Sequence, residues 1–398
     1  MCNSFLEQLF ISDSWLLLIA AFFIATFAVW VIHPRLVKLA LMKDIVDNPN
    51  SRKLQRTPVP VLGGVAVFFG ISLGLGVVSP FYDSASLCII LGVMIVMLYV
   101  GTIDDIMGLS ASIRFVIEII SVLLLIFICQ NSINDFHGLW GITELSTWIA
   151  VPLTVFISVG IINSINLIDG VNGLSSGFCI MASVIFGCFF YYVGDYSMAI
   201  LAATCVGALI PFFLHNVFGN TSRMFIGDGG TLLMGIIMSV FVIHILNSKS
   251  QMVDLSERGI GLIPFAMAVL VIPVFDTVRV MSSRVFRGRS PFMPDRTHLH
   301  HLFIYLGFSH AGTALCVLIL NALVVLIWLL LWKLGVSVEG QLYAVILMGL
   351  LFTFGLYPYV KSLSKTSSLL RILRILGVWS HIERKGGYLW IQQKLDKV

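Results

Sequence analysis

Long apolar runs alternate with short polar segments along almost the whole chain. We count eleven runs of about 20 residues, centred on residues 14–33, 62–82, 86–103, 114–130, 147–165, 175–194, 197–215, 229–247, 260–281, 312–334 and 339–360. An α-helix of that length crosses a hydrocarbon core about 30 Å thick and satisfies its own backbone hydrogen bonds there. The pattern predicts an all-α, polytopic membrane protein with about eleven transmembrane helices.

The composition supports this prediction and excludes an ordinary soluble protein. Of the 398 residues, 58% are hydrophobic and only 11% are charged, whereas soluble domains carry about 25% charged residues. No fixed repeat or flexible linker divides the chain, so we expect one transmembrane domain over residues 1–360. A basic tail, 361–398, sets Leu, Ile and Trp against Arg and Lys at helical spacing. This tail is interpreted either as an interfacial helix or as a mobile basic segment.

The distribution of Lys and Arg predicts the orientation. The chain has 24 such residues, and all but Lys249, Arg258 and Lys333 lie in one set of loops or in the tail. Because basic residues stay on the cytoplasmic side, the N-terminus is expected outside and the C-terminus inside the cell, in the cytoplasmic (inner) membrane. No nucleic-acid-binding motif accompanies these residues, so nucleic acid is not expected as a partner, whereas membrane lipids are.

The polar motifs gather on this predicted cytoplasmic side. They occupy five loops, 34–61, 104–113, 166–174, 216–228 and 282–311. Polar side chains at the ends of spans are costly unless they face a cavity or a ligand. We therefore expect an active site on the cytoplasmic face.

Acidic residues are the first candidates for chemistry. Asp104 and Asp105 end the third run, Asp169 follows the fifth, and Asp228 precedes the eighth. Each alone is also explained as a solvated turn or a helix cap. Together they offer the oxygen ligands that Mg²⁺ prefers, usually one or two carboxylates plus substrate phosphates.

Two polar segments refine the prediction. Asn163, Asn166 and Asp169 recur every three residues and form one stripe if the helix continues, although a single Asn would more simply bridge two helices. Asp228 is flanked by glycines in "FIGDGGT". Glycines allow close approach to a ligand, and the amides at a helix N-terminus favour phosphate.

The loop after the ninth run is rich in cationic donors. It contains Arg284, Arg287, Arg289, Arg296, His298, His300 and His301. Guanidinium groups bind phosphate in a bidentate manner, so a nucleotide diphosphate is the favoured ligand, while some of these arginines also serve as positive-inside anchors. Zinc is disfavoured because no Cys or HExxH framework accompanies the histidines.

Taken in order, the motifs resemble one family. The segments "DNPNSRK", "PVPVLGG", "GTIDDIMGL", "NSINLIDGVNGL", "RMFIGDGGT" and "SPFMPDRTHLHH" are similar to those of the polyprenyl-phosphate N-acetylhexosamine-1-phosphate transferases, within the WecA-like branch that uses UDP-N-acetylglucosamine. The resemblance implies transfer of a sugar 1-phosphate from a UDP-N-acetyl sugar to undecaprenyl phosphate, with release of UMP, as the first lipid-linked step of a cell-surface glycan such as O-antigen, lipopolysaccharide or capsule. A homodimer is also implied.

The resemblance assigns roles residue by residue. It implies Asp104, Asp105 and Asp169 as catalytic residues, and Asp228 with Asp105 as ligands of Mg²⁺, for which Mn²⁺ is the alternative. The substrate-binding residues that it implies are Arg52, Lys53, Asn163, Asn166, Asn216, Phe225, Arg284, Arg289, Arg296, His298, His300 and His301. Direct attack by the acceptor and a phospho-enzyme both remain open at this point.

Departures from related patterns narrow the alternatives. "HLHH" differs from the consecutive histidines of the muramoyl-peptide branch, which argues against a peptidoglycan precursor, while other UDP-N-acetyl sugars of the FucNAc or QuiNAc type remain alternatives. An intramembrane aspartyl protease would need GxGD, but Phe225 stands where the first Gly belongs. A CDP-alcohol phosphotransferase would need Ala-Arg after Asp169-Gly170, but other residues follow here. A transporter should show polar residues near mid-span and internal repeats, whereas here the polar residues lie at the ends of the spans.

Overall fold

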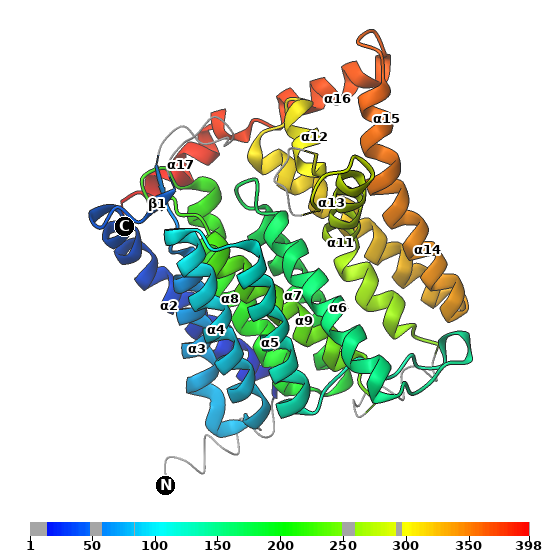
Figure 1. Cartoon of the computed structure of the whole chain (residues 1–398). Helices are drawn as coiled ribbons and strands as arrows, with labels where there is room; N and C mark the ends of the chain where they lie inside the picture. The colour runs from blue at the N-terminus through cyan, green and yellow to red at the C-terminus, as the bar shows by residue number, and fades with distance from the viewer. Residues whose placement is uncertain (1–13, 48–57, 83, 249–258, 292–296, 398) are drawn as a thin grey trace. The chain divides into compact units, whose positions relative to one another are not determined.

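Membrane-length helices make up most of the structure. The computed structural model describes residues 14–47, 58–82, 84–248, 259–291 and 297–397 (Figure 1). Eleven helices are long and apolar enough to cross a membrane, which confirms the all-α polytopic fold. They are α2 (Ser14–Met42), α3 (Gly63–Val78), α4 (Ala85–Met107), α5 (Ala111–Cys129), α6 (Thr147–Leu167), α7 (Leu174–Val193), α8 (Tyr196–Phe218), α9 (Gly227–Ile245), α11 (Leu262–Phe286), α13 (His310–Lys333) and α14 (Val338–Leu350) with its continuation.

The eleventh span contains an irregular turn. After α14, a π-helical segment η3 (Leu351–Gly355) leads into α15 (Leu356–Ser362). The hydroxyl of the fully buried Thr353 donates to the carbonyl of Gly349 at 2.7 Å. Such a wide turn inserts one extra residue into an α-helix.

Short elements complete the chain. The strands β1 (Val46–Asp47) and β2 (Val59–Pro60) pair antiparallel, with Val46 opposite Pro60. The remaining elements are η1 (Ser79–Phe81), η2 (Leu139–Gly141), α12 (Leu299–Tyr305), α16 (Ser368–Trp379), η4 (Ile382–Arg384) and α17 (Gly386–Leu395).

Several spans run further into the polar segments than the sequence pattern predicts. Helix α2 continues to Met42, past Pro34, instead of ending near residue 33, and α11 continues to Phe286. Helix α4 includes Asp104 and Asp105 in its last turn, so these carboxylates lie on a helix rather than in a loop. A hydropathy pattern stops at the first charges, although a helix continues across the interface when its charged ends reach water.

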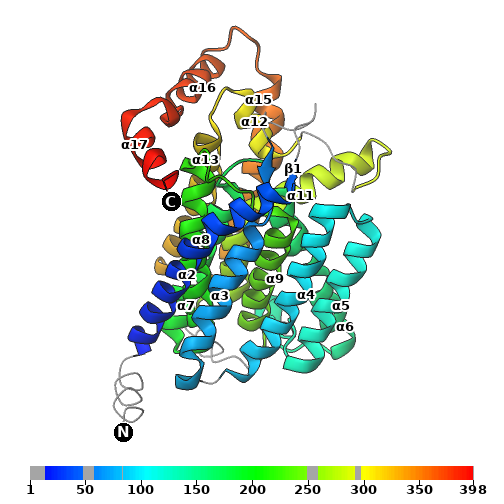
Figure 2. The same cartoon turned by 90° about the vertical axis from the view of Figure 1, so that its left-hand side faces the viewer.

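The helices form two compact units, where the sequence analysis expects a single domain. The first unit contains residues 1–131, 176–241 and 390–398, and the second contains residues 132–175 and 242–389. In the first unit, α2 packs against α3 and α8, and α4 packs against α5 (Figure 2). The rings of Phe186, Phe190 and Phe241 meet in its core at centroid distances of 5.4–6.4 Å.

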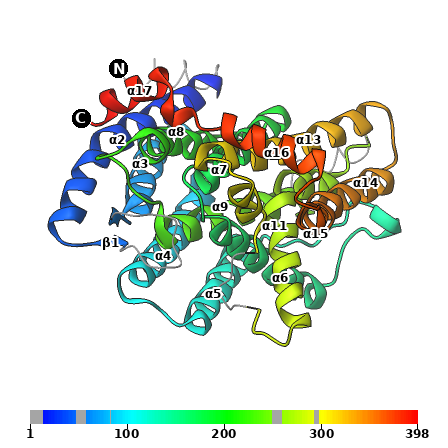
Figure 3. The same ribbon diagram turned by 90° about the horizontal axis from the view of Figure 1, so that it is seen from above.

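Helix α11 is the centre of the second unit. It packs against α6, α13 and α14 (Figure 3). Pro273 lies inside α11 and cannot donate a hydrogen bond to the carbonyl of Val269. The buried side chain of Asn321 on α13 donates to that carbonyl at 2.9 Å and accepts from the amide of Ile272 at 3.1 Å. The buried side-chain amide of Asn321 thereby satisfies the backbone group that Pro273 leaves without its helical hydrogen bond, in a region where water is absent.

The predicted orientation gives a direct experiment. Reporter fusions at Lys249, which lies outside the described residues, and at Arg289 should report opposite sides of the membrane, because all but three basic residues fall on one predicted side. Alkaline phosphatase and fluorescent protein activities of the two fusions provide the measurement. The same reporter signal from both sites would show that the orientation prediction is wrong.

Candidate active site

The glycine-rich segment before α9 is held by the segment before α3. The amide of Phe225 donates to the carbonyl of Pro60 at 2.8 Å, and the amides of Gly63 and Gly64 donate to residues 225 and 226 at 3.0 and 2.8 Å. A methyl group on Gly64 would lie only 2.6 Å from the Cα of Gly230. The motifs "PVPVLGG" and "FIGDGG" therefore need their glycines to pack against each other.

Asp105 fixes the beginning of α9. Its two carboxylate oxygens accept hydrogen bonds from the amides of Asp228 at 2.9 Å and Gly229 at 3.2 Å. A carboxylate at this position satisfies two backbone amides and interacts favourably with the helix dipole. The sequence analysis expects these amides to bind phosphate; in the structure they bind Asp105 instead.

Arg114 lies close to three other carboxylates at this end of the first unit. Its Nη1 lies 3.0 Å from Oδ2 of Asp104 and 3.6 Å from Oδ2 of Asp228, and its Nε lies 3.8 Å from the buried Glu118. Asp104 also accepts from the amide of Leu109 at 2.6 Å. We call Asp104, Asp105, Arg114 and Asp228 the carboxylate cluster.

The carboxylate cluster has the donor chemistry of a divalent-cation site. The carboxylates of Asp104 and Asp228 face one guanidinium group, the carboxylate of Asp105 binds the backbone amide of Asp228, and the side chain of Asp228 is 36% exposed. Within the described ranges, no three His, Cys, Asp or Glu side chains form a ready-made metal cage. Mg²⁺ commonly binds through one or two carboxylates and completes its ligands with water and substrate phosphates, so the cluster fits this ion.

Two other predicted residues lie near this cluster. Asn216, at the end of α8, is buried, and its side chain donates to the carbonyl of Met224 at 2.8 Å. Phe225 is half-buried. Asn216 therefore has a structural role in positioning the segment that leads to Asp228.

The second unit contains a buried aspartate that accepts several hydrogen bonds. Asp276 on α11 accepts from Nδ1 of His298 at 2.9 Å and from the amide of Leu299 at 3.1 Å. Arg279, one turn further, donates to Asp276 at 2.7 Å. We call Asp276, Arg279, His298 and His300 the histidine cluster.

The histidine cluster has a defined orientation. Because Nδ1 of His298 faces Asp276, its Nε2 points away from that carboxylate. Arg279 also donates to the carbonyl of Thr297 at 2.5 Å, and its guanidinium lies 4.2 Å from the ring centre of Tyr357. The arginine and the aspartate thus lock the first residues of α12 in place.

His300 contacts the turn after α6. A Cβ atom on Gly170 would lie 3.0 Å from both Cδ2 and Cε1 of the imidazole, so only glycine fits there. Burial lowers the pKa of His300 well below its ordinary value of 6.5, and the nearby His301 and His298 lower it further. His300 is therefore neutral near pH 7 and acts as a hydrogen-bonding rather than a charged group.

The expected stripe of Asn163, Asn166 and Asp169 is interrupted. Helix α6 ends at Leu167, so the exposed Asp169 lies in the following turn, where it accepts from the hydroxyl of Ser175. Asn163 is buried and donates to the carbonyl of Val159 in its own helix at 3.0 Å. The carboxylate of Asp169 and the two amides therefore do not form one helical face.

The predicted cationic residues differ in their surroundings. Arg284 is buried, and its guanidinium donates to the carbonyl of Pro291, whereas Arg289 is exposed. Arg52, Lys53 and Arg296 lie outside the described residues. Arg284 thereby shapes the loop that precedes the histidine cluster.

The end of the chain supports the loop before Asp228. Asp396, after α17, accepts from the amides of Asn220 and Ser222 at 3.0 and 3.1 Å and from the hydroxyl of Ser222 at 3.0 Å. Burial would raise the pKa of Asp396, but these hydrogen bonds hold it below its ordinary value. The contact is therefore expected to weaken when the pH falls far enough to protonate Asp396.

Comparison with known proteins shows which family the chain resembles. Residues 87–246, which include the whole carboxylate cluster, match the family described as glycosyl transferase family 4. An undecaprenyl-phosphate alpha-N-acetylglucosaminyl 1-phosphate transferase from Escherichia coli (strain K12) is 28% identical over 330 residues, which is 81% of this chain and 85% of the relative. This part of the chain is therefore similar to glycosyl transferase family 4.

Two further relatives carry the same name as the protein from Escherichia coli. The one from Salmonella typhi is 28% identical over 275 residues, covering 68% of this chain and 72% of the relative. The one from Yersinia pestis is 26% identical over 325 residues, which is 81% of this chain and 85% of the relative. The family match and these relatives confirm the predicted resemblance and the expectation that the chain is a membrane-bound transferase, a phosphoglycosyl transferase.

Three residues are missing from the site predicted from the sequence, namely Arg114, Asp276 and Arg279. A signal for the last two exists, because an acidic and a basic residue three positions apart inside an apolar run indicate a buried ion pair. Arg114 has a similar signal in Glu118, four positions along the same helix. Its contacts with Asp104 and Asp228 have no such signal, because these two residues lie in other helices.

Proposed function

We propose that this protein transfers N-acetylglucosamine 1-phosphate from UDP-N-acetylglucosamine to undecaprenyl phosphate and releases UMP. The observation that carries the proposal is the carboxylate cluster, in which Arg114 lies between Asp104 and Asp228 at the ends of spanning helices. The acceptor and the sugar are those in the names of the relatives from Escherichia coli and Yersinia pestis. The product would begin a cell-surface glycan at the cytoplasmic membrane.

The reaction makes one phosphorus–oxygen bond and breaks another. An oxygen of the acceptor phosphate attacks the phosphorus that carries the sugar. The bond from that phosphorus to the oxygen bridging the two phosphates breaks, and UMP leaves with the electron pair. The sugar–oxygen bond stays intact, and the product is a lipid diphosphate sugar. Such a transfer depends on alignment and charge neutralisation more than on covalent help.

The carboxylate cluster suits this task. Asp228, with Asp105 and Asp104 beside it, would hold Mg²⁺, or Mn²⁺ in its place, and the ion supplies charge neutralisation at the diphosphate. Asp104 orients the guanidinium of Arg114, which offers donors to phosphate oxygens. Asp105 fixes the position of Asp228 through its backbone amide.

The hydrogen bonds of the cluster favour direct transfer over a phospho-enzyme. Asp104 already accepts from Leu109 and Arg114, and Asp105 accepts from two amides. A carboxylate engaged in this way is a weakened nucleophile. We propose that the acceptor phosphate attacks directly, while the histidine cluster and Arg284 provide donors for the nucleotide.

The proposal has a simple biochemical test. Purified full-length protein is incubated with UDP-N-acetylglucosamine, undecaprenyl phosphate and Mg²⁺, and UMP release is measured. Parallel reactions contain other UDP-N-acetyl sugars, or lack the acceptor. Acceptor-dependent UMP release that is fastest with UDP-N-acetylglucosamine supports the proposal. Acceptor-independent release, or a clear preference for another sugar, would overturn it, and a stable phosphate label on the protein would exclude direct transfer.

Asp105→Asn is expected to lower kcat while leaving the affinity for UDP-N-acetylglucosamine nearly unchanged. The variant keeps one acceptor oxygen but loses the charge at the start of α9, which costs about 0.5–2 kcal/mol of stability as a lost helix cap. The misplaced Asp228 then slows turnover. Steady-state kinetics, nucleotide calorimetry and thermal unfolding in detergent measure the three quantities.

A matched control loses a cap elsewhere. Ser337 accepts from the amide of Gly340 at the start of α14, so Ser337→Ala should lower stability but keep kcat. His298→Ala is expected to show the converse pattern, with weakened nucleotide binding. Loss of nucleotide binding in Asp105→Asn together with full binding in His298→Ala would show that the two roles are assigned the wrong way round.

A further inference from the structure

Helix α16 is fixed at its C-terminal end to the segment that follows α12. The amide of Ser309 donates to the hydroxyl of Ser380 at 2.9 Å, and the hydroxyl of Ser309 donates to the carbonyl of Ser380 at 2.7 Å. Nε2 of His381 lies 3.1 Å from the carbonyl oxygen of Gly307. These contacts give α16 a defined orientation in the second unit, so the tail forms a docked helix here rather than a mobile segment.

The side chains of α16 divide it into faces. Leu370 and Gly377 are buried and turn toward the protein. Ile372, Ile375 and Trp379 lie on another side and are 54%, 47% and 72% exposed. A helix that displays such large apolar side chains needs an apolar environment on that side.

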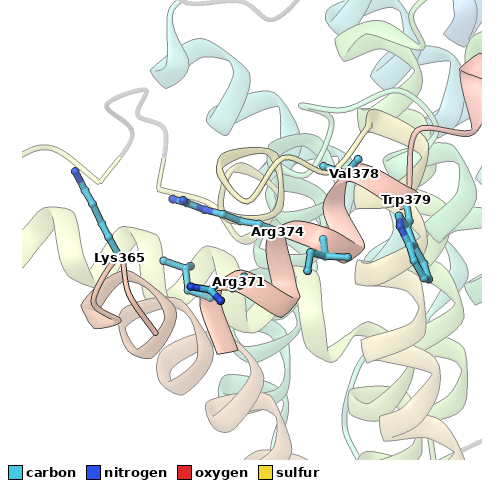
Figure 4. A pocket seen from close by; sticks show the side chains of 7 residues that line it. Lys365, Arg371, Arg374, Val378 and Trp379 are labelled. Atoms are coloured by element: carbon cyan, nitrogen blue, oxygen red, sulfur yellow. The ribbon is translucent and has the colours of Figure 1, made fainter. Parts of the chain in front are cut away.

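A basic flank borders the apolar face. Arg371 and Arg374, with Lys365 from the preceding turn, line a cavity of about 500 Å³. The other lining residues are apolar, namely Leu370, Ile375, Val378 and Trp379. Figure 4 shows Lys365, Arg371 and Arg374 toward one end of the helix and Trp379 at the other end. The cavity therefore combines three positive charges with an apolar wall.

The position of α16 in the chain places it at a membrane surface. The last spanning helix ends at Ser362, and α16 begins at Ser368 after a short connection. In Figure 1, α16 runs across the direction of α14 and α15. A helix that turns sideways directly after a span lies where head groups meet acyl chains.

We propose that α16 and Lys365 form a binding site for an anionic phospholipid of the bilayer. The lipid phosphate lies among Lys365, Arg371 and Arg374, and the acyl chains lie along the exposed side of Ile375 and Trp379. Guanidinium groups bind phosphate oxygens in pairs, while their aliphatic stems can lie against acyl chains. This site is independent of the proposed transferase reaction.

The geometry favours a bilayer lipid over a soluble phosphate. Four of the seven lining side chains are apolar, and a free phosphate or a nucleotide would leave them exposed to water. The apolar face continues along the helix through Ile372. Such a long, open face suits a lipid that already occupies the surrounding leaflet.

The test measures lipid binding by the full-length protein. Delipidated protein in neutral detergent is titrated with phosphatidylglycerol or phosphatidylcholine, and bound lipid is counted by native mass spectrometry. The variant Lys365→Gln/Arg371→Gln/Arg374→Gln is expected to bind phosphatidylglycerol about ten-fold more weakly or worse, because each basic residue near an anionic lipid strengthens binding severalfold. Binding of phosphatidylcholine should not change.

The control removes the same charge elsewhere. Lys38, Lys43 and Arg287 are exposed and lie outside the proposed site and on the same predicted side of the membrane. Their triple replacement by Gln should leave phosphatidylglycerol binding unchanged. An equal loss in both variants would indicate a general surface potential, and full binding in the α16 variant would exclude the site. Stronger binding of undecaprenyl phosphate than of phosphatidylglycerol at α16 would assign the site to the acceptor; each of these results overturns the proposal.

A second measurement does not depend on the stability of the triple variant. Native protein and Trp379→Phe are reconstituted in bilayers containing brominated phosphatidylglycerol, and the quenching due to Trp379 is obtained by difference. We expect stronger quenching by brominated phosphatidylglycerol than by brominated phosphatidylcholine at the same mole fraction. Equal quenching by the two lipids would contradict the proposal.

Discussion

Asp228→Asn should abolish turnover without unfolding the protein. The substitution keeps the size of the side chain but removes a carboxylate that is 36% exposed and lies 3.6 Å from Arg114. An exposed ion pair contributes about 0–1 kcal/mol of stability, so the fold should persist. Loss of a preorganised electrostatic group at the reacting phosphate costs roughly 100-fold or more in rate. UMP release over a series of Mg²⁺ concentrations, with thermal unfolding alongside, measures both effects.

A control for this variant removes a carboxylate that lies outside the carboxylate cluster. Asp195 accepts from the amide of Met198 at the start of α8, and Asp195→Asn should leave the rate and the Mg²⁺ response nearly unchanged. If Asp228→Asn retains a near-normal rate and an unchanged metal titration, Asp228 does not belong to the active site.

Asp276→Asn should lower kcat/KM for UDP-N-acetylglucosamine about 10- to 100-fold through weaker nucleotide binding, the range seen when a group that orients a functional histidine is lost. Asp276 accepts from Nδ1 of His298 and from the amide of Leu299, and it pairs with the buried Arg279. The loss of one charged hydrogen bond should also cost about 1.5–3 kcal/mol of stability. Steady-state kinetics over a range of pH, together with thermal unfolding, provide the measurement.

A double variant separates positioning from general destabilisation. If Asp276 acts through His298, then Asp276→Asn/His298→Gln should be no slower than the slower of the two single variants. Asp135→Asn, which removes another buried carboxylate that accepts from a backbone amide, should lower stability and spare kcat/KM. Fully additive losses of rate would argue that Asp276 and His298 act separately.

The sequence predicts the spans well because a membrane leaves few alternatives. Hydropathy locates all eleven membrane-length helices of the described chain, and it is wrong mainly where a helix continues past its first charges, as α2 does to Met42. Once lipid has selected helices, their order follows directly from the apolar runs. The division into two compact units has no such signal, because it depends on which helices pack together.

The candidate site is only partly visible in the sequence, because residue type does not reveal a partner. The sequence predicts Asp104, Asp105, Asp169 and Asp228 at one site, with Asp105 and Asp228 as metal ligands. In the structure, Asp104 and Asp228 share Arg114. Asp105 is of the same type and adjacent, yet its carboxylate holds amides more than one hundred positions away. Asp276 and Arg279 have a sequence signal in their three-residue spacing, but the contact of Asp276 with His298 becomes apparent only after folding.

In each unit, a carboxylate from another helix binds backbone amides at the start of a helix. Asp105 binds the first amides of α9, and Asp276 binds the first amide of α12. In both places an anion from another helix occupies a site where a substrate phosphate would otherwise be attracted. Under the proposed function, we therefore expect substrate phosphates to bind to side chains and a divalent ion rather than to these helix ends.

The wide turn at η3 makes the second unit tolerant of one change in chain length. An α-helix advances about 100° per residue, but the wide turn accommodates its extra residue within a single turn. Deletion of one residue within Leu351–Gly355 would therefore convert the turn to regular helix and leave the orientation of α15 nearly unchanged. Tyr357 would stay against the guanidinium of Arg279, which lies 4.2 Å from its ring centre. In a natural variant that has lost this extra residue, the aromatic partner of Arg279 should be encoded one position earlier in the chain.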